Sequence, residues 1–230
     1  FTNENYDKLT KDMAGKAEIM QAWQLGYGYI GINAGKIPNI NLRRAIMAAM
    51  DTNRAISYYR TGTATKIAWP MSNVSWAYPK NEEGALDNNN GHDYTMFTND
   101  EEAKAKIRNY MAAAGSYSQS DLSVTFTIAG SNLNEHPVYQ VFVHAQALLN
   151  ECGWDVNIEP DINALTKLST GSLSVWAAAW GSTIDPDMYQ VYHKNSTATS
   201  VLAWGYREIL ASPSTYPIEN NILTDLSEVI

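Results

Sequence analysis

Several residue types that define common classes of protein are scarce in this 230-residue sequence. It has a single cysteine, Cys152, which excludes an internal disulfide framework and any zinc site built from several cysteines. Only 17% of its residues are charged, and an acidic excess gives a formal net charge of −8. Because Lys and Arg supply most of the affinity for phosphate backbones and anionic membranes, we expect no nucleic acid partner.

Long hydrophobic runs are missing as well. No stretch approaches the roughly 18 consecutive apolar residues of a membrane-spanning helix, and the first residues lack the basic-then-apolar layout of a secretion signal. The chain begins at Phe1 rather than at methionine, so we expect a processed form or an excised part of a longer protein. A hydrophobic content of 45% is enough for a substantial core.

Motifs for catalysis are also lacking. The sequence has no G-x-S-x-G elbow, no G-x-x-x-x-G-K-[ST] phosphate loop and no H-E-x-x-H helix, and Gly26-Tyr27-Gly28 resembles a phosphate-binding turn only superficially. His136 and His144 are eight residues apart, too far for one helical face to present both to a metal ion. Cys152 lies at a predicted helix C-terminus, where the helix dipole disfavours a thiolate. We therefore predict neither a cofactor nor a metal.

Apolar spacing predicts strands and helices that alternate along the chain. Strand patterns occupy residues 27–33, 122–128, 156–158 and 173–180. Helical patterns occupy residues 41–50, 100–114, 137–152 and 162–168, with a short helix ending at Gly62 and a last one from Asn220. This alternation indicates an α/β fold with a mixed or mainly parallel central sheet flanked by helices. Residues 63–97 have little periodicity and many breakers, so they form a predicted long loop region.

Two features of the sequence leave alternatives open. Trp69 and Trp76 in the long loop fit either core anchors or walls of a ligand site. Asp185 and Asp187 follow the predicted strand that ends at Trp180, where ligands gather in α/β sheets. An acid pair suits a glycosidase, although two aspartates separated only by Pro186 do not readily face each other across a substrate. Asp185 also fits a helix cap with Pro186 at the first helical position, or a carboxylate that captures a cation.

Four blocks of sequence stand out by their order and spacing. They are residues 29–33 with 41–51 and Gly62-Thr63-Ala64, residues 100–115, residues 148–156, and Trp180-Gly181 with Asp185-Pro186-Asp187. Together these blocks resemble the extracytoplasmic solute-binding proteins of peptide-type ABC importers, family 5, which carry oligopeptides, dipeptides, nickel and some sugars. No block is specific alone; the order and spacing of all four carry the likeness, which covers roughly residues 25–210.

The resemblance implies a fold and a place in a larger protein. Family members are more than twice this length and have two lobes with a ligand cleft between them. The matching part is the second, C-terminal lobe, a type II periplasmic-binding-protein-like lobe, so we expect residues 1–230 to form a single domain that faces another lobe. It also implies an extracytoplasmic location, with a lipid anchor attached through a segment outside this chain, and docking of the ligand-closed form on a membrane permease. No enzymatic activity is expected.

The resemblance also implies ligand-binding residues. Trp180, Gly181, Ser182 and Thr183 line the cleft, and the loop that carries Trp69 and Trp76 approaches the ligand. In peptide-binding members an aspartate at the position of Thr183 holds the free amino group of the peptide.

Here the nearest acid is Asp185, which is the candidate for capture of an amine. An oligopeptide is the ligand that we expect. The aromatic content and the missing amine anchor favour a sugar as the alternative ligand, and a secreted hydrolase that uses Asp185 or Asp187 is the alternative of a different class.

Overall fold

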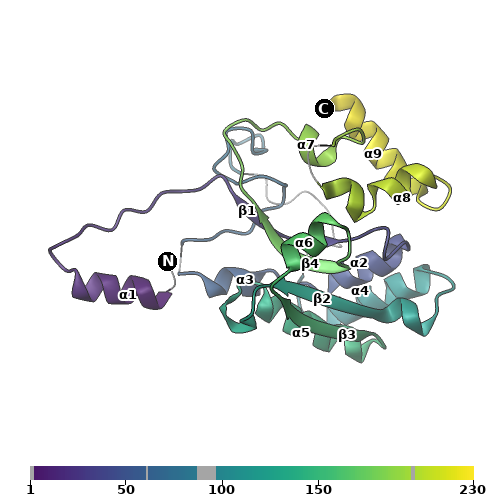
Figure 1. The fold of residues 1–230 in the computed structure, drawn as a ribbon, viewed down its shortest axis with the longest axis horizontal. Helices are drawn as coiled ribbons and strands as arrows, with labels where there is room; N and C mark the ends of the chain where they lie inside the picture. The colour runs from purple at the N-terminus through teal and green to yellow at the C-terminus, as the bar shows by residue number, and fades with distance from the viewer. Residues whose placement is uncertain (1–2, 61, 87–96, 198–199) are drawn as a thin grey trace.

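A computed structural model describes residues 3–60, 62–86, 97–197 and 200–230 of the chain (Figure 1). The strands are β1 (Tyr27–Ile32), β2 (Ser123–Ala129), β3 (Asp155–Asp161) and β4 (Val175–Trp180). The α-helices are α1 (Asn3–Asp12), α2 (Ile40–Ala48), α3 (Asn53–Tyr58), α4 (Asp100–Ala113), α5 (Tyr139–Glu151), α6 (Ala164–Ser169), α7 (Tyr189–Tyr192), α8 (Tyr206–Ala211) and α9 (Pro217–Val229). Short 3₁₀ helices are η2 (Gln119–Leu122), η3 (Leu133–Glu135) and η4 (Ser200–Trp204).

The four strands form one mixed sheet in the order β1-β4-β2-β3. β2 pairs in parallel with both β3 and β4, whereas β1 pairs antiparallel with β4. The predicted α/β fold with a mixed central sheet is therefore confirmed. Because β1 runs against β4, Tyr27 at the start of β1 lies opposite Trp180 at the end of β4.

The main core lies between the sheet and the helices α2, α4 and α5. Phe126 of β2 packs on Phe142 of α5 with ring centroids 4.9 Å apart, and both side chains are fully buried. Local signals start these helices where they were predicted: the side chain of Asn39 accepts hydrogen bonds from Asn41 N and Leu42 N, and Asn99 caps α4. The apolar stripes of the three helices then face the sheet.

The opposite face of the sheet carries an aromatic layer. Tyr29 and Trp176 project to this face, and Trp204 of η4 covers them together with α6. Trp176 lies across β1 at Gly31, where an added Cβ would come within 2.3 Å of the indole ring. The glycine spacing that resembles a phosphate-binding turn thus falls in and just before a strand, at Gly26, Gly28 and Gly31, and one of these glycines makes room for a tryptophan.

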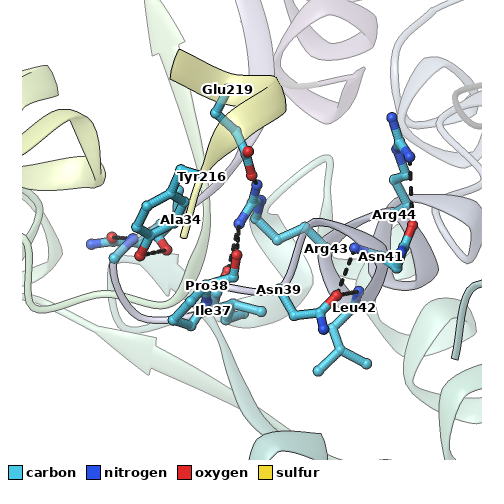
Figure 2. A network of polar contacts seen from close by, with 12 residues as sticks. Ala34, Ile37, Pro38, Asn39, Asn41, Leu42, Arg43, Arg44, Tyr216 and Glu219 are labelled. Carbon is cyan, nitrogen blue, oxygen red and sulfur yellow. Dashed lines mark hydrogen bonds and ion pairs between the residues drawn. The ribbon is translucent and has the colours of Figure 1, made fainter. Parts of the chain in front are cut away.

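The last two helices are attached to the segment between β1 and α2 (Figure 2). Arg43 of α2 is buried and donates hydrogen bonds to Ile37 O at 2.7 Å and Pro38 O at 2.8 Å, and its other terminal nitrogen pairs with Glu219 of α9. The hydroxyl of Tyr216 donates to Ala34 O at 3.1 Å. α8 and α9 are thereby fixed on the side of the molecule away from α3 and α5 (Figure 1).

Some predicted boundaries shift in the structure. β3 continues to Asp161, so α6 begins only at Ala164, and the predicted helical residues Ile162 and Leu165 are 77% and 74% exposed. α9 begins at Pro217, and of its predicted apolar face only Leu223 is buried. Within the predicted loop 63–97, the described residues contain no helix or strand apart from an isolated bridge between Lys80 and Leu86, and residues 87–96 lie outside the described part.

Candidate functional site

An open groove lies where β1 begins and β4 ends. Its volume is about 700 Å³. One wall is the segment that enters β1, and the other is the end of β4 with the loop that follows. The lining residues are Trp23, Gln24, Leu25, Gly26, Tyr27, Gly28, Ala179, Trp180, Gly181 and Ser182.

Trp180 is held in place by other aromatic rings. Its indole stacks on Tyr29 with ring centroids 6.0 Å apart and planes 9° apart, and Trp204 lies 6.1 Å away on a tilted plane. Its backbone is also closely approached, because an added Cβ at Gly26 would lie 2.9 Å from Trp180 O. Glycine at this position therefore lets the two walls of the groove lie close together.

The surface of the groove is uncharged. None of its ten lining residues has a charged side chain. Two of them are tryptophans and three are glycines, so aromatic faces alternate with exposed backbone. Such a surface binds by stacking and by hydrogen bonds to main-chain groups.

The loop after β4 contains the predicted acids. Asp185 and Asp187 are both exposed, and each accepts a backbone hydrogen bond two residues on: Asp185 from Asp187 N at 3.1 Å, and Asp187 from Tyr189 N at 2.8 Å. The expected helix cap by Asp185 is wrong, since α7 begins at Tyr189 with Met188 at its N-cap. Asp185 stabilises a local turn instead, which its short side chain does as readily as it caps a helix.

Two half-buried tyrosines lie near the groove residue Tyr27: Tyr192 interacts with it directly, and Tyr206 lies next to Tyr192. Burial raises the pKa of Tyr192, and the neighbouring Tyr27 raises it further. Burial also raises the pKa of Tyr206 to about 12, and its hydroxyl donates to Val191 O at 2.9 Å. These phenols are neutral at physiological pH, so they serve as hydrogen-bonding supports and not as bases.

Part of the long loop reaches the groove. Ser72 Oγ donates to Gln24 O at 3.0 Å, and Trp76 Nε1 donates to Ile184 O at 3.1 Å. Trp76 is 70% exposed, so the structure does not use it as a core anchor. Trp69 is half-buried and is not among the residues that line the groove.

The structure thus places the predicted site residues in two groups. Trp180, Gly181 and Ser182 line the groove, whereas Thr183 and Asp185 lie in the exposed loop just beyond, where Thr183 Oγ1 donates to Asp185 O at 3.3 Å. Sequence reasoning missed the wall formed by residues 23–28. The sequence predicts the strand that this wall leads into, but it does not predict that this strand pairs antiparallel with β4.

Other kinds of site find little support in the described residues. No three His, Cys, Asp or Glu side chains in these ranges gather to hold a metal ion. Burial raises the pKa of the Cys152 thiol, which disfavours its nucleophilic form. No helix in this part of the chain has the length and apolar character needed to cross a membrane.

The mixed sheet flanked by helices has the periplasmic-binding-protein-like fold. Residues 2–200 match the model for bacterial extracellular solute-binding proteins, family 5, middle part, and the chain belongs to this family. The predicted resemblance is therefore confirmed. The family consists of extracytoplasmic solute-binding proteins and is not a family of enzymes.

Solved structures agree with this fold. The oligopeptide-binding protein AppA from Bacillus subtilis, in complex with a nonapeptide, superposes with a TM-score of 0.65 at 18% identity over 98% of this chain and 45% of that one. The Escherichia coli murein tripeptide binding protein MppA superposes with a TM-score of 0.62 at 20% identity, over 99% of this chain and 43% of that one. OppA from Haemophilus influenzae, in complex with RPPGFSPFR, superposes with a TM-score of 0.61 at 17% identity, over 98% of this chain and 43% of that one.

The chain therefore spans less than half the length of these solved structures. Among curated protein sequences, none shows significant similarity to it.

Proposed function

We propose that this chain is the substrate-capture lobe of a solute-binding protein that serves a peptide-type ABC importer. The observation that carries the proposal is the open, uncharged groove lined by Trp180, Gly181 and Ser182. Membership of family 5 supports it, and so do the ligands in the AppA and OppA structures, which are peptides. In this proposal residues 1–230 form one domain, the second lobe of a larger two-lobed protein.

Capture follows from the geometry of the groove. A peptide lies with its main chain against the glycine-rich walls and one side chain near Trp180. Thr183 and Asp185 in the adjoining loop, and Trp69 and Trp76 from the long loop, meet the ligand as the other lobe closes over it. The closed form then docks on a membrane permease, and the ligand leaves chemically unchanged.

The openness of the groove has an energetic consequence. A ligand that touches only this lobe stays largely hydrated and loses the contacts that the second lobe supplies. Because affinity depends on how completely a ligand is enclosed, the 230-residue chain binds weakly and the two-lobed protein binds tightly. A lipid anchor outside this chain would hold the protein at the outer face of the membrane.

Native mass spectrometry of the full-length protein, purified without added ligand, tests the proposal. We expect a co-purified peptide, whose rebinding is then measured by calorimetry. Trp180→Ala should weaken rebinding at least about tenfold, which is about 1.4 kcal/mol. Ile162→Ala, which truncates an exposed apolar side chain just after β3 and outside the groove, serves as the control and should leave binding unchanged.

Either of two results would overturn the proposal and favour another function. A co-purified sugar would assign the groove to a sugar-binding member of the family. Hydrolysis of the recovered ligand that disappears in Asp185→Asn would make the protein an enzyme.

A further inference from the structure

Residues 68–78 form a loop that is closed on itself. Tyr78 is 2% exposed, and its hydroxyl accepts a hydrogen bond from Ala68 N at 3.1 Å, which joins the two ends of the segment. Ser72 is also buried and caps an inner turn, where Ser75 N donates to Ser72 O at 3.0 Å. The segment is thus tied together at its two ends and at an inner turn, as in a compact loop whose ends lie close together.

This loop contacts both walls of the groove. The Ser72 hydroxyl donates to Gln24 O in the wall that enters β1. The Trp76 indole N–H donates to Ile184 O, two residues beyond Ser182 in the other wall. The two attachment points are four residues apart in one closed loop, so the loop fixes the spacing between segments that are far apart in the sequence.

The loop after β4 has few other supports. Its residues 181–185 are exposed, and the hydrogen bonds of Thr183 and Asp185 stay within the loop. Among the hydrogen bonds and ion pairs of the described residues, the bond from Trp76 is the one that joins residues 181–185 to a distant segment.

From these contacts we infer that residues 68–78 are a brace for the ligand groove, and that Trp76 is a positioning residue that acts through Ile184. The brace holds the loop 181–188 at its middle while Ser72 holds residue 24, so the groove keeps its width before ligand arrives. The statement that the brace helps to capture a ligand rests on the proposed function. The statement that Trp76 positions the loop 181–188 does not depend on that function.

Hydrogen exchange followed by mass spectrometry tests this inference on the 230-residue chain without any ligand. Trp76→Phe keeps an aromatic ring but removes the indole N–H. We expect exchange in residues 182–187 to become roughly five- to tenfold faster, since an opening equilibrium shifts by about the strength of one hydrogen bond. Exchange in β2 and the midpoint of urea unfolding should not change.

Trp23→Phe is the matched control. Trp23 is 63% exposed in the same groove, and within the described contacts its indole N–H has no hydrogen-bond partner, so exchange should stay as in the parent chain. Ser72→Ala should accelerate exchange around residues 23–26.

The inference is overturned if Trp76→Phe leaves exchange in 182–187 unchanged, if it accelerates exchange throughout the chain, or if Trp23→Phe has the same effect. Because no ligand is present, a failed binding assay would count against the proposed function and not against the brace.

Discussion

Gly31 occupies a place in β1 where the neighbouring strand leaves no room for a side chain. The indole of Trp176, its pairing partner on β4, lies where a Cβ would be, at 2.3 Å. Trp176 is itself 3% exposed and packed against Trp204, so it has little freedom to move away. Gly31→Ala should therefore lower the free energy of unfolding by about 2 kcal/mol, as overpacking does in other cores. Urea denaturation measures this loss.

Gly28 in the same strand provides the comparison. A Cβ there would meet nothing closer than Ala178 O at 3.8 Å, an ordinary contact. Gly28→Ala should keep or slightly raise stability, because alanine loses less backbone entropy on folding. Equal losses for the two variants would mean that Trp176 is not the cause.

Tyr206 gives a residue-scale prediction about alkaline pH. Its pKa rises from 10.0 to about 12 in the folded chain because burial disfavours the phenolate. The group therefore contributes stability that is complete below pH 10 and is lost as the pH rises from 10 through 12. Chemical denaturation at pH 9, 10, 11 and 12 should show this decline.

Tyr206→Phe separates titration from hydrogen bonding. At pH 7 it should cost about 1 kcal/mol, because Val191 O loses its donor. The decline between pH 10 and 12 should be smaller than in the parent chain, with Tyr192 supplying the rest. A decline of unchanged size would exclude Tyr206 as its source.

At the scale of elements, α9 depends on one buried ion pair. The guanidinium of Arg43 also bonds Ile37 O and Pro38 O, so loss of its partner leaves a buried charge only partly compensated. Glu219→Gln should lower the free energy of unfolding by about 2–3 kcal/mol and accelerate hydrogen exchange in α9. Glu101→Gln removes an exposed carboxylate that pairs with Lys104, which keeps Glu151 as a second partner, so this variant should stay within about 0.5 kcal/mol of the parent chain. Similar losses for both variants would contradict a special role for α9.

The elements themselves could largely be predicted from sequence. Apolar spacing located α2 and α4, and the side chains of Asn39 and Asn99 cap their first turns in the structure, because such signals act within one or two turns of chain. The four motif blocks identified the family because their order and spacing along the chain resemble those of the family. Only one wall of the groove could be predicted. Trp180 ends a predicted strand, whereas residues 23–28 reach it because β1, from Tyr27 on, pairs antiparallel with β4, and this pairing has no local signal in the sequence.

Asp185 shows why the remaining details could not be predicted. An Asp-Pro pair suits a helix start and a tight turn equally well, and the choice depends on where α7 packs. The bond from Trp76 to Ile184 spans 108 residues, so no local signal indicates it, and the sequence analysis offers Trp76 only as a core anchor or a wall of a ligand site.

At the scale of the whole molecule, the main core and the C-terminal helices share their attachment to the segment after β1. Arg43 belongs to the helix that covers the sheet, and Tyr216 bonds the segment that follows β1. If residues 1–230 form one domain, as proposed, heat should unfold both parts together. Circular dichroism and tryptophan fluorescence should then give one midpoint. Separate midpoints would divide the chain into two units.

At the N-terminal end of the described chain, α1 contacts the rest of the molecule at Arg60, which pairs with Asp7 and lies over the ring of Tyr6. α1 is joined to β1 by a long extended segment, and residues 7–24 are exposed almost throughout (Figure 1). Lys8 and Lys11 lie in the exposed helix α1, and Lys16 lies in the turn between α1 and the extended segment, so a protease can reach all three without first unfolding the core. Brief trypsin treatment should therefore trim the chain in this region first, and leave a shorter product that keeps the groove, the brace and the sheet intact.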